Sequence, residues 1–115
     1  MTTPEEPYRH LPTVIKQRIA IVGVCASGKT MLTEALRRRG FDANCCAQEH
    51  SYVPDMWQRF LHPEVLIYLD ASWEAVRARR EVDYGPDYLD EQRLRLAHAR
   101  EHCTLYLDTS RLTEE

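Results

Sequence analysis

Three apolar runs along the chain have the length and composition of buried strands. They occupy residues 18–24 (RIAIVGV), 65–70 (VLIYLD) and 104–108 (TLYLD). Continuous apolar runs of this length are typical of strands that are covered on both faces in a parallel sheet. A weaker run of small residues at 43–48 (ANCCAQ) predicts one more strand.

Apolar residues recur at helical spacing between these runs. After the first strand, Leu32, Ala35 and Leu36 predict a helix that Gly40 terminates. Three further helices are predicted from capping residues and apolar spacing, at 54–61, 72–80 and 89–102. The alternation indicates one α/β domain over 17–115, with helices around a mostly parallel sheet of about four strands. Residues 1–16 are expected to form a poorly ordered arm.

The turn between the first strand and the first helix carries the strongest chemical signal. Residues 23–30 read GVCASGKT and match the pattern G-x-x-x-x-G-K-[ST]. In this pattern the loop amides and the helix N-terminus surround a β-phosphate, the lysine reaches the β- and γ-phosphates, and the hydroxyl binds Mg²⁺. Chance produces such a match in roughly one chain in 200–300 of this length, so a turn without a ligand is the weaker alternative.

We therefore expect residues 23–30 to bind ATP or another nucleoside triphosphate together with Mg²⁺. The predicted nucleotide-binding residues are Gly23, Cys25, Ala26, Ser27, Gly28, Lys29, Thr30 and Met31. Lys29 is also a predicted catalytic residue, because it neutralises charge on the transferring phosphoryl group, and Thr30 is a predicted metal ligand.

With this motif, the chain resembles the P-loop nucleotide and small-molecule kinases, the group of thymidylate, adenylate, deoxynucleoside, shikimate and gluconate kinases. Residues 65–80 look like the strand and helix that precede the lid in thymidylate-type enzymes. Residues 105–115 look like the last strand and adenine-side loop of shikimate- and gluconate-type kinases. The resemblance implies a three-layer P-loop NTPase fold and transfer of the γ-phosphate to a nucleoside, nucleotide or small hydroxylated metabolite.

The same resemblance implies further site residues. Arg77 and Arg80 would close over the transferring phosphoryl group as lid arginines. Arg79, Ser110 and Arg111 would contact the nucleotide. Compensation of the helix dipole is the alternative interpretation of the three lid arginines.

The chain also departs from this group. Only residues 41–64 separate the first helix from the strand before the lid, and a full acceptor-binding insert does not fit there. One strand of the group is missing, and the run at 43–48 matches either its second strand or its third, which holds the Walker B carboxylate. A catalytically weak or inactive regulatory module is therefore an alternative to a kinase, and an NTPase is a second alternative.

Three carboxylates follow predicted strands, at the sheet edge where open α/β folds bind ligands. Glu49 is a candidate for holding Mg²⁺ or for acting as base toward an acceptor hydroxyl, with a solvated loop acid as the alternative. Asp70 fits the Walker B form or has a structural role. Asp108 is a weaker metal candidate and fits turn or cap chemistry better.

Other chemically active residues have ordinary structural interpretations. The arginines at 37–39 compensate the dipole at the end of the first helix. His50 lies near Cys45 and Cys46, but nothing completes a structural zinc site, and Cys25 has no evident base partner. Four aromatic side chains are expected in the core rather than stacked on a base: Tyr52, Trp57, Phe60 and Trp73.

Composition limits the partners. The 115 residues are 43% hydrophobic and carry a formal charge of −3, so nothing in the overall charge attracts nucleic acid or a membrane. The first residues contain no apolar segment, and the four cysteines contain no C-x-x-C pair, which predicts reduced thiols in the cytoplasm. The expected partners are a nucleotide and a small-molecule acceptor, and the exposed edges of a small sheet permit a homodimer.

Overall fold

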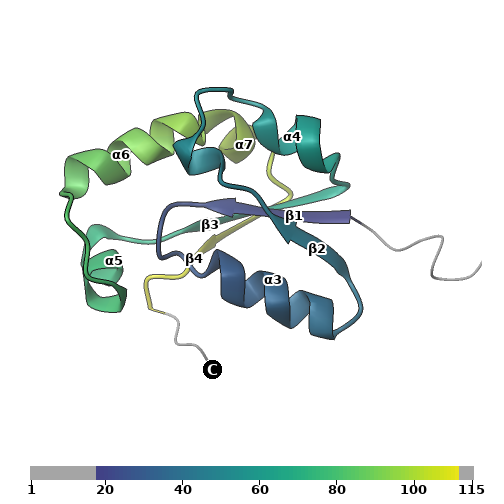
Figure 1. Cartoon of the computed structure of the whole chain (residues 1–115), viewed down its shortest axis with the longest axis horizontal. Coiled ribbons are helices and arrows are strands. Elements are labelled where there is room, and N and C mark those ends of the chain that lie inside the picture. Colours follow the sequence, from purple (N-terminus) through teal and green to yellow (C-terminus); the bar gives the residue numbers. More distant parts are fainter. Residues whose placement is uncertain (1–17, 112–115) are drawn as a thin grey trace, which may run out of the picture.

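A computed structural model describes residues 18–111 (Figure 1). One sheet contains four parallel strands in the order β2-β1-β3-β4. The strands are β1 (Arg18–Gly23), β2 (Asp42–Cys45), β3 (Val65–Asp70) and β4 (Leu105–Asp108). The predicted α/β class and the size of the sheet are thus confirmed for this part of the chain. The predicted arm at 1–16 lies outside the described residues, as do residues 17 and 112–115 of the predicted domain.

Helices cover both faces of this sheet (Figure 1). On one face lies α3 (Lys29–Arg38), and on the other lie α4 (Met56–Leu61), α6 (Pro86–Arg95) and α7 (Ala97–His102). The short helix α5 (Trp73–Arg79) follows β3. Its N-cap is Ser72, whose hydroxyl accepts a hydrogen bond from the Ala75 amide at 3.2 Å, as the sequence predicts.

The core is divided by the sheet. On the side of α4, α6 and α7, Val22 and Tyr68 of the strands pack with Trp57, Leu89 and Leu96 of the helices. On the side of α3, the strand residues Ile21, Ile67 and Leu69 pack against Leu32 and Leu36. Successive residues of a strand point to opposite faces. The apolar runs of β1 and β3 therefore supply both halves of the core, whereas β4, predicted as a buried strand, lies at the edge of the sheet and is mostly exposed.

Two predicted elements have different boundaries in the structure. The strand expected at 43–48 ends at Cys45, and the 3₁₀ helix η1 (Gln48–His50) follows it. The buried Gln48 side chain ties this turn to the segment that follows, since it accepts a hydrogen bond from the Trp57 amide and donates one to the Val53 carbonyl. The helix expected at 89–102 begins at Pro86 and is divided at Leu96, whose amide bonds the carbonyls of both Gln92 and Arg93.

Among residues 18–111, no helix combines the length and the apolar character that a membrane crossing requires.

Candidate functional site

The loop of residues 24–28 leaves β1 where a side chain cannot be accommodated. A Cβ atom on Gly23 would lie 2.2 Å from the Leu69 carbonyl oxygen and 2.8 Å from Ser27 Oγ. This close approach arises because β1 and β3 remain paired up to Gly23 and Leu69. The first glycine of the motif is therefore required by contact with neighbouring backbone.

The last glycine of the motif is required by its backbone conformation. Gly28 has φ of +100° and forms the N-cap of α3. The first N–H groups of a helix have no partner inside it, and no side chain within residues 18–111 caps those of α3. The first turn of α3 also contains no acidic residue. This end of the helix is consequently a favourable place for an anion.

Three side chains from distant elements hold the loop in place. Gln92 of α6 accepts a hydrogen bond from the Cys25 amide at 2.9 Å. Arg79 of α5 donates to the Ala26 carbonyl at 2.9 Å, and it also bonds Thr109 beyond β4. The Thr109 hydroxyl donates to the Ser27 carbonyl at 2.8 Å. Arg79 thus positions the loop, and it also lines the pocket described below; the nucleotide contact predicted for it stays a prediction.

Lys29 folds back over the loop. Its ammonium group donates to the carbonyls of Gly23 and Val24 at 2.9 and 3.1 Å, and to Glu49 Oε2 at 2.8 Å. The side chains of Lys29 and Glu49 are only 14% and 5% exposed, so solvent screens this ion pair weakly. The second oxygen of the carboxylate, Oε1, is buried and has no hydrogen-bond partner within residues 18–111.

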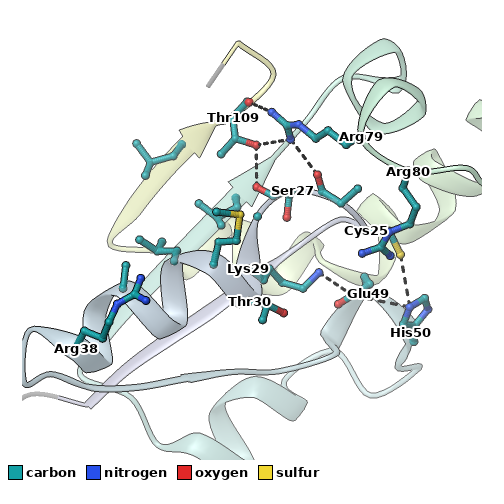
Figure 2. Close-up of a pocket in the computed structure, with 17 residues that line it drawn as sticks. Cys25, Ser27, Lys29, Thr30, Arg38, Glu49, His50, Arg79, Arg80 and Thr109 are labelled. Carbon is teal, nitrogen blue, oxygen red and sulfur yellow. Dashed lines mark hydrogen bonds and ion pairs between the residues drawn. The ribbon is translucent and has the colours of Figure 1, made fainter. Parts of the chain in front are cut away.

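These groups line one pocket of about 920 Å³. Figure 2 shows that Lys29 and Thr30 from α3, Glu49 and His50 from η1, and Arg80 from the end of α5 surround it. The pocket brings together most of the predicted site residues: Cys25, Ala26, Ser27, Gly28, Lys29, Thr30, Met31, Glu49, Arg79 and Arg80. Glu49 lies at this edge of the sheet as predicted, although it belongs to η1 and does not end a strand.

Besides Gly23, whose position at the end of β1 is described above, four predicted site residues lie outside the lining of this pocket. Arg77 is exposed on α5. Ser110 donates to Asp108 Oδ1 and accepts from the Ser72 amide, and Arg111 is exposed. The structure therefore does not include Arg77, Ser110 or Arg111 among the residues that line the pocket. The hydrogen bonds from Ser110 lower the pKa of Asp108, which agrees with the turn chemistry expected there.

Asp70 is the fourth residue, and its carboxylate is occupied by protein donors. Oδ1 accepts from the Ala71 amide at 2.8 Å and from Arg93 Nε at 3.2 Å, while Oδ2 accepts from the Tyr106 hydroxyl at 2.8 Å. Burial and the Asp70 carboxylate raise the pKa of Tyr106. Burial alone would lower the pKa of Arg93, but the same carboxylate raises it overall. Of the two roles considered for Asp70, the geometry supports the structural one over metal binding.

The structure also assembles residues that sequence reasoning missed. His50 Nε2 lies 3.7 Å from Cys25 Sγ, so this thiol does have an imidazole neighbour. Arg38, interpreted as compensating the dipole, lines the far end of the pocket. Gln92 and Thr109 hold the loop from α6 and from the end of β4, which come next to the loop only in the folded chain. Gln92 could have been found as a polar residue within an apolar helix face. Thr109 could have been found as the polar residue directly after the last strand.

The predicted aromatic core is only partly correct. Trp57 is 5% exposed, and Trp73 packs against the core. Tyr52 and Phe60 are 84% and 75% exposed, because residues 51–55 turn away from the sheet and α4 covers it through its Trp57 face. Near the pocket, the pKa of Cys46 is raised to about 11, mainly by burial and secondly by the Glu49 carboxylate. The pKa of Tyr84 is also raised, mainly by burial and secondly by the Cys25 thiol.

In comparison with known proteins, no family model and no curated protein matches this chain. Function is therefore inferred from the geometry of the pocket alone.

Proposed function

We propose that the protein is a P-loop protein that binds a nucleoside triphosphate with Mg²⁺ and acts as a small phosphotransferase. The observation that carries the proposal is the juxtaposition of an uncapped helix N-terminus, Lys29 and Glu49 around one pocket. An uncapped N-terminus next to a lysine favours an anion with several oxygens. The lysine lies beside the helix N-terminus, where β- and γ-phosphates bind in loops of this sequence pattern.

The residues around the loop also fit a magnesium ion. Mg²⁺ takes oxygen ligands and retains several waters. Thr30 offers an exposed hydroxyl at the start of α3, and Glu49 offers the buried oxygen Oε1 without a hydrogen-bond partner among the described residues. Asp70 does not fit, because Arg93, Tyr106 and Ala71 already occupy its oxygens. When bound, the ion would neutralise phosphate charge.

Two positive groups have distinct parts in the proposed reaction. Lys29 would donate to phosphate oxygens and stabilise charge that develops on them during transfer. Arg80 lines the same pocket, and its side chain makes no hydrogen bond or ion pair within residues 18–111, so its guanidinium is available for the γ-phosphoryl group. Arg79 would keep the loop in shape through Ala26 and Thr109.

A regulatory module that binds nucleotide without transferring phosphate is the second candidate. The observation that favours it concerns the segment between α3 and β3, where an acceptor site would be expected. In this segment Gln48 and Trp57 are buried and hydrogen-bonded to each other, so the segment completes the core. His50 and Glu49 are the residues that it contributes to the pocket.

Calorimetric titration with Mg·ATP and Mg·GTP tests binding. Lys29→Met should weaken nucleotide binding by roughly 10- to 100-fold, because charge-assisted hydrogen bonds contribute about 1.5–3 kcal/mol each. Arg59→Ala is the matched control, since Arg59 is an exposed cation paired with Asp55 on α4. Circular dichroism verifies that each variant is folded. Unchanged affinity in a folded Lys29→Met variant would contradict the proposal.

A product assay over nucleosides, nucleotides and small hydroxylated metabolites then separates the two candidates. If some acceptor is phosphorylated, and if this activity is lost in the Arg80→Ala variant, the result supports the phosphotransferase. Nucleotide binding without phosphorylation of any acceptor supports the regulatory module.

A further inference from the structure

Cys25, Glu49 and His50 place three different metal-ligating groups on one wall of the pocket (Figure 2). Their ligand atoms all lie within 4.8 Å of one another. Cys25 belongs to the loop after β1, whereas Glu49 and His50 belong to η1, so the cluster exists only because β2 and η1 lie beside β1.

We propose that these three side chains form a site for a thiophilic divalent cation, of which Zn²⁺ is the best match. A thiolate and an imidazole select zinc over the oxygen-seeking Mg²⁺. The thiolate and the carboxylate together carry the two negative charges that neutralise the ion. Binding would release the thiol proton of Cys25 to solvent.

The distances agree with tetrahedral zinc. With Zn–S near 2.3 Å and Zn–N near 2.05 Å, a tetrahedral ion separates the two ligand atoms by about 3.6 Å. Cys25 Sγ and His50 Nε2 lie 3.7 Å apart. Two ligands with bonds near 2.05 Å are separated by about 3.3 Å, and His50 Nε2 lies 3.8 Å from Glu49 Oε2. The ligand atoms of Cys25 and Glu49 lie within 4.8 Å of each other, so side-chain adjustments would have to bring the Glu49 carboxylate closer to the other two ligands.

Two further observations point to a ligand at this place. Glu49 is 4% exposed, yet its Oε1 has no hydrogen-bond partner in the described part of the chain. A buried carboxylate oxygen without a partner costs free energy that a bound cation would recover. In addition, His50 Nδ1 lies 3.5 Å from the Tyr88 hydroxyl. A partner on Nδ1 leaves Nε2 free to bind a metal, which is the arrangement that metal-ligating histidines adopt.

The fourth coordination position would face the pocket. Three protein ligands with one open position are typical of zinc sites that bind water or an anionic ligand. Lys29 competes with the ion, because its ammonium group holds Glu49 Oε2 at 2.8 Å. Its removal should therefore strengthen zinc binding, whereas the function proposed above requires Lys29→Met to weaken nucleotide binding. Zn²⁺ and the Mg²⁺ of the proposed function would compete for Glu49, but the opposite effects expected of Lys29→Met allow the two proposals to fail independently.

Titration of the reduced protein with Co²⁺ in the absence of nucleotide tests the site. We expect one equivalent of Co²⁺ to produce a thiolate-to-cobalt charge-transfer band in the near ultraviolet and the intense visible bands of tetrahedral cobalt, and Zn²⁺ to displace it. Cys25→Ser should abolish the charge-transfer band, and His50→Gln should weaken binding by at least about 10-fold. Tyr88→Phe should weaken it by up to about 10-fold while the band remains.

Matched controls come from residues of the same types outside the cluster. Cys103→Ser and His62→Gln should leave the titration unchanged, since neither residue belongs to the cluster. A charge-transfer band that persists in Cys25→Ser, a weak octahedral spectrum, or unchanged affinity in folded His50→Gln would overturn the proposal. The proposal would also be contradicted if the Lys29→Met variant bound Co²⁺ less tightly than the unaltered protein.

Discussion

Among the Gly→Ala substitutions within residues 18–111, Gly23→Ala should destabilise the protein most. The new Cβ would lie 2.2 Å from the Leu69 carbonyl oxygen and 2.8 Å from Ser27 Oγ. The hydroxyl of Ser27 can rotate away, but the carbonyl oxygen belongs to β3, which is paired with β1 at this position. To relieve the clash, the two strands must separate by roughly 1 Å. This separation is costly because packed interiors yield little.

The expected cost follows from this displacement. Added methyl groups in packed interiors cost about 1–3 kcal/mol, and a clash with paired backbone falls at the upper end of that range. For a domain of this size, each kcal/mol lowers the melting temperature by about 4–8 °C. Gly23→Ala should therefore melt roughly 12–24 °C below the unaltered protein, as followed by circular dichroism at several heating rates.

Two other glycines separate the possible causes. Gly28 has φ of +100° and no neighbouring atom within 4 Å of the position that a Cβ would occupy, so Gly28→Ala should show backbone strain alone, about 1–2 kcal/mol. Gly85 is extended and also has open space, so Gly85→Ala should cost less than about 1 kcal/mol. If Gly23→Ala melted within about 2 °C of Gly85→Ala, the close approach of β1 and β3 at this loop would be refuted.

Three further substitutions test the surroundings of the site. Ser72→Ala should reduce the free energy of unfolding by about 1 kcal/mol in urea denaturation, because it removes the N-cap of α5. Asp70→Asn should reduce it by about 1.5–3 kcal/mol, since Arg93 loses the less exposed of its two carboxylate partners and keeps only Asp90, while nucleotide affinity stays unchanged. The pKa of Cys46 rises from 9.0 to about 11 on folding, so the folded protein retains the thiol proton longer and stability is lost as pH rises through this window. Cys46→Ala should therefore show a smaller fall in unfolding midpoint between these pH values than the unaltered protein, and an equal fall would contradict the assignment.

Local sequence information was sufficient for the elements that frame the site. The apolar runs predict β1, β3 and β4 to within about a residue. For β1 and β3 the reason is that strands buried on both faces require unbroken apolar sequence, whereas β4 has an apolar sequence although it is an edge strand and mostly exposed. Residues 23–30 predict the turn before α3, because close backbone approach at Gly23 and the left-handed conformation at Gly28 each require glycine. The N-cap at Ser72 was predicted for the same kind of reason, since capping depends on neighbours within one turn.

Local information was insufficient for the roles of the charged residues. The sequence places both Asp70 and Glu49 at the ends of predicted strands, yet in the structure Asp70 contacts Arg93 and Tyr106, whereas Glu49 contacts Lys29. The difference depends on which strand is adjacent to β1 and on where the chain turns after β2. Neither is encoded in the spacing of nearby residues, because pairing partners and turn geometry are settled by long-range packing.

The sequence by itself therefore determined where the backbone curves from β1 into α3, since glycine and helix-start requirements act over a few residues. Only the tertiary structure decided which side chains surround that curve. Thr109 reaches the Ser27 carbonyl across 82 residues of sequence, and His50 reaches Cys25 across 25. Such contacts form because the parallel strands end at one edge of the sheet, so residues that follow different strands meet there however far apart they lie in the chain.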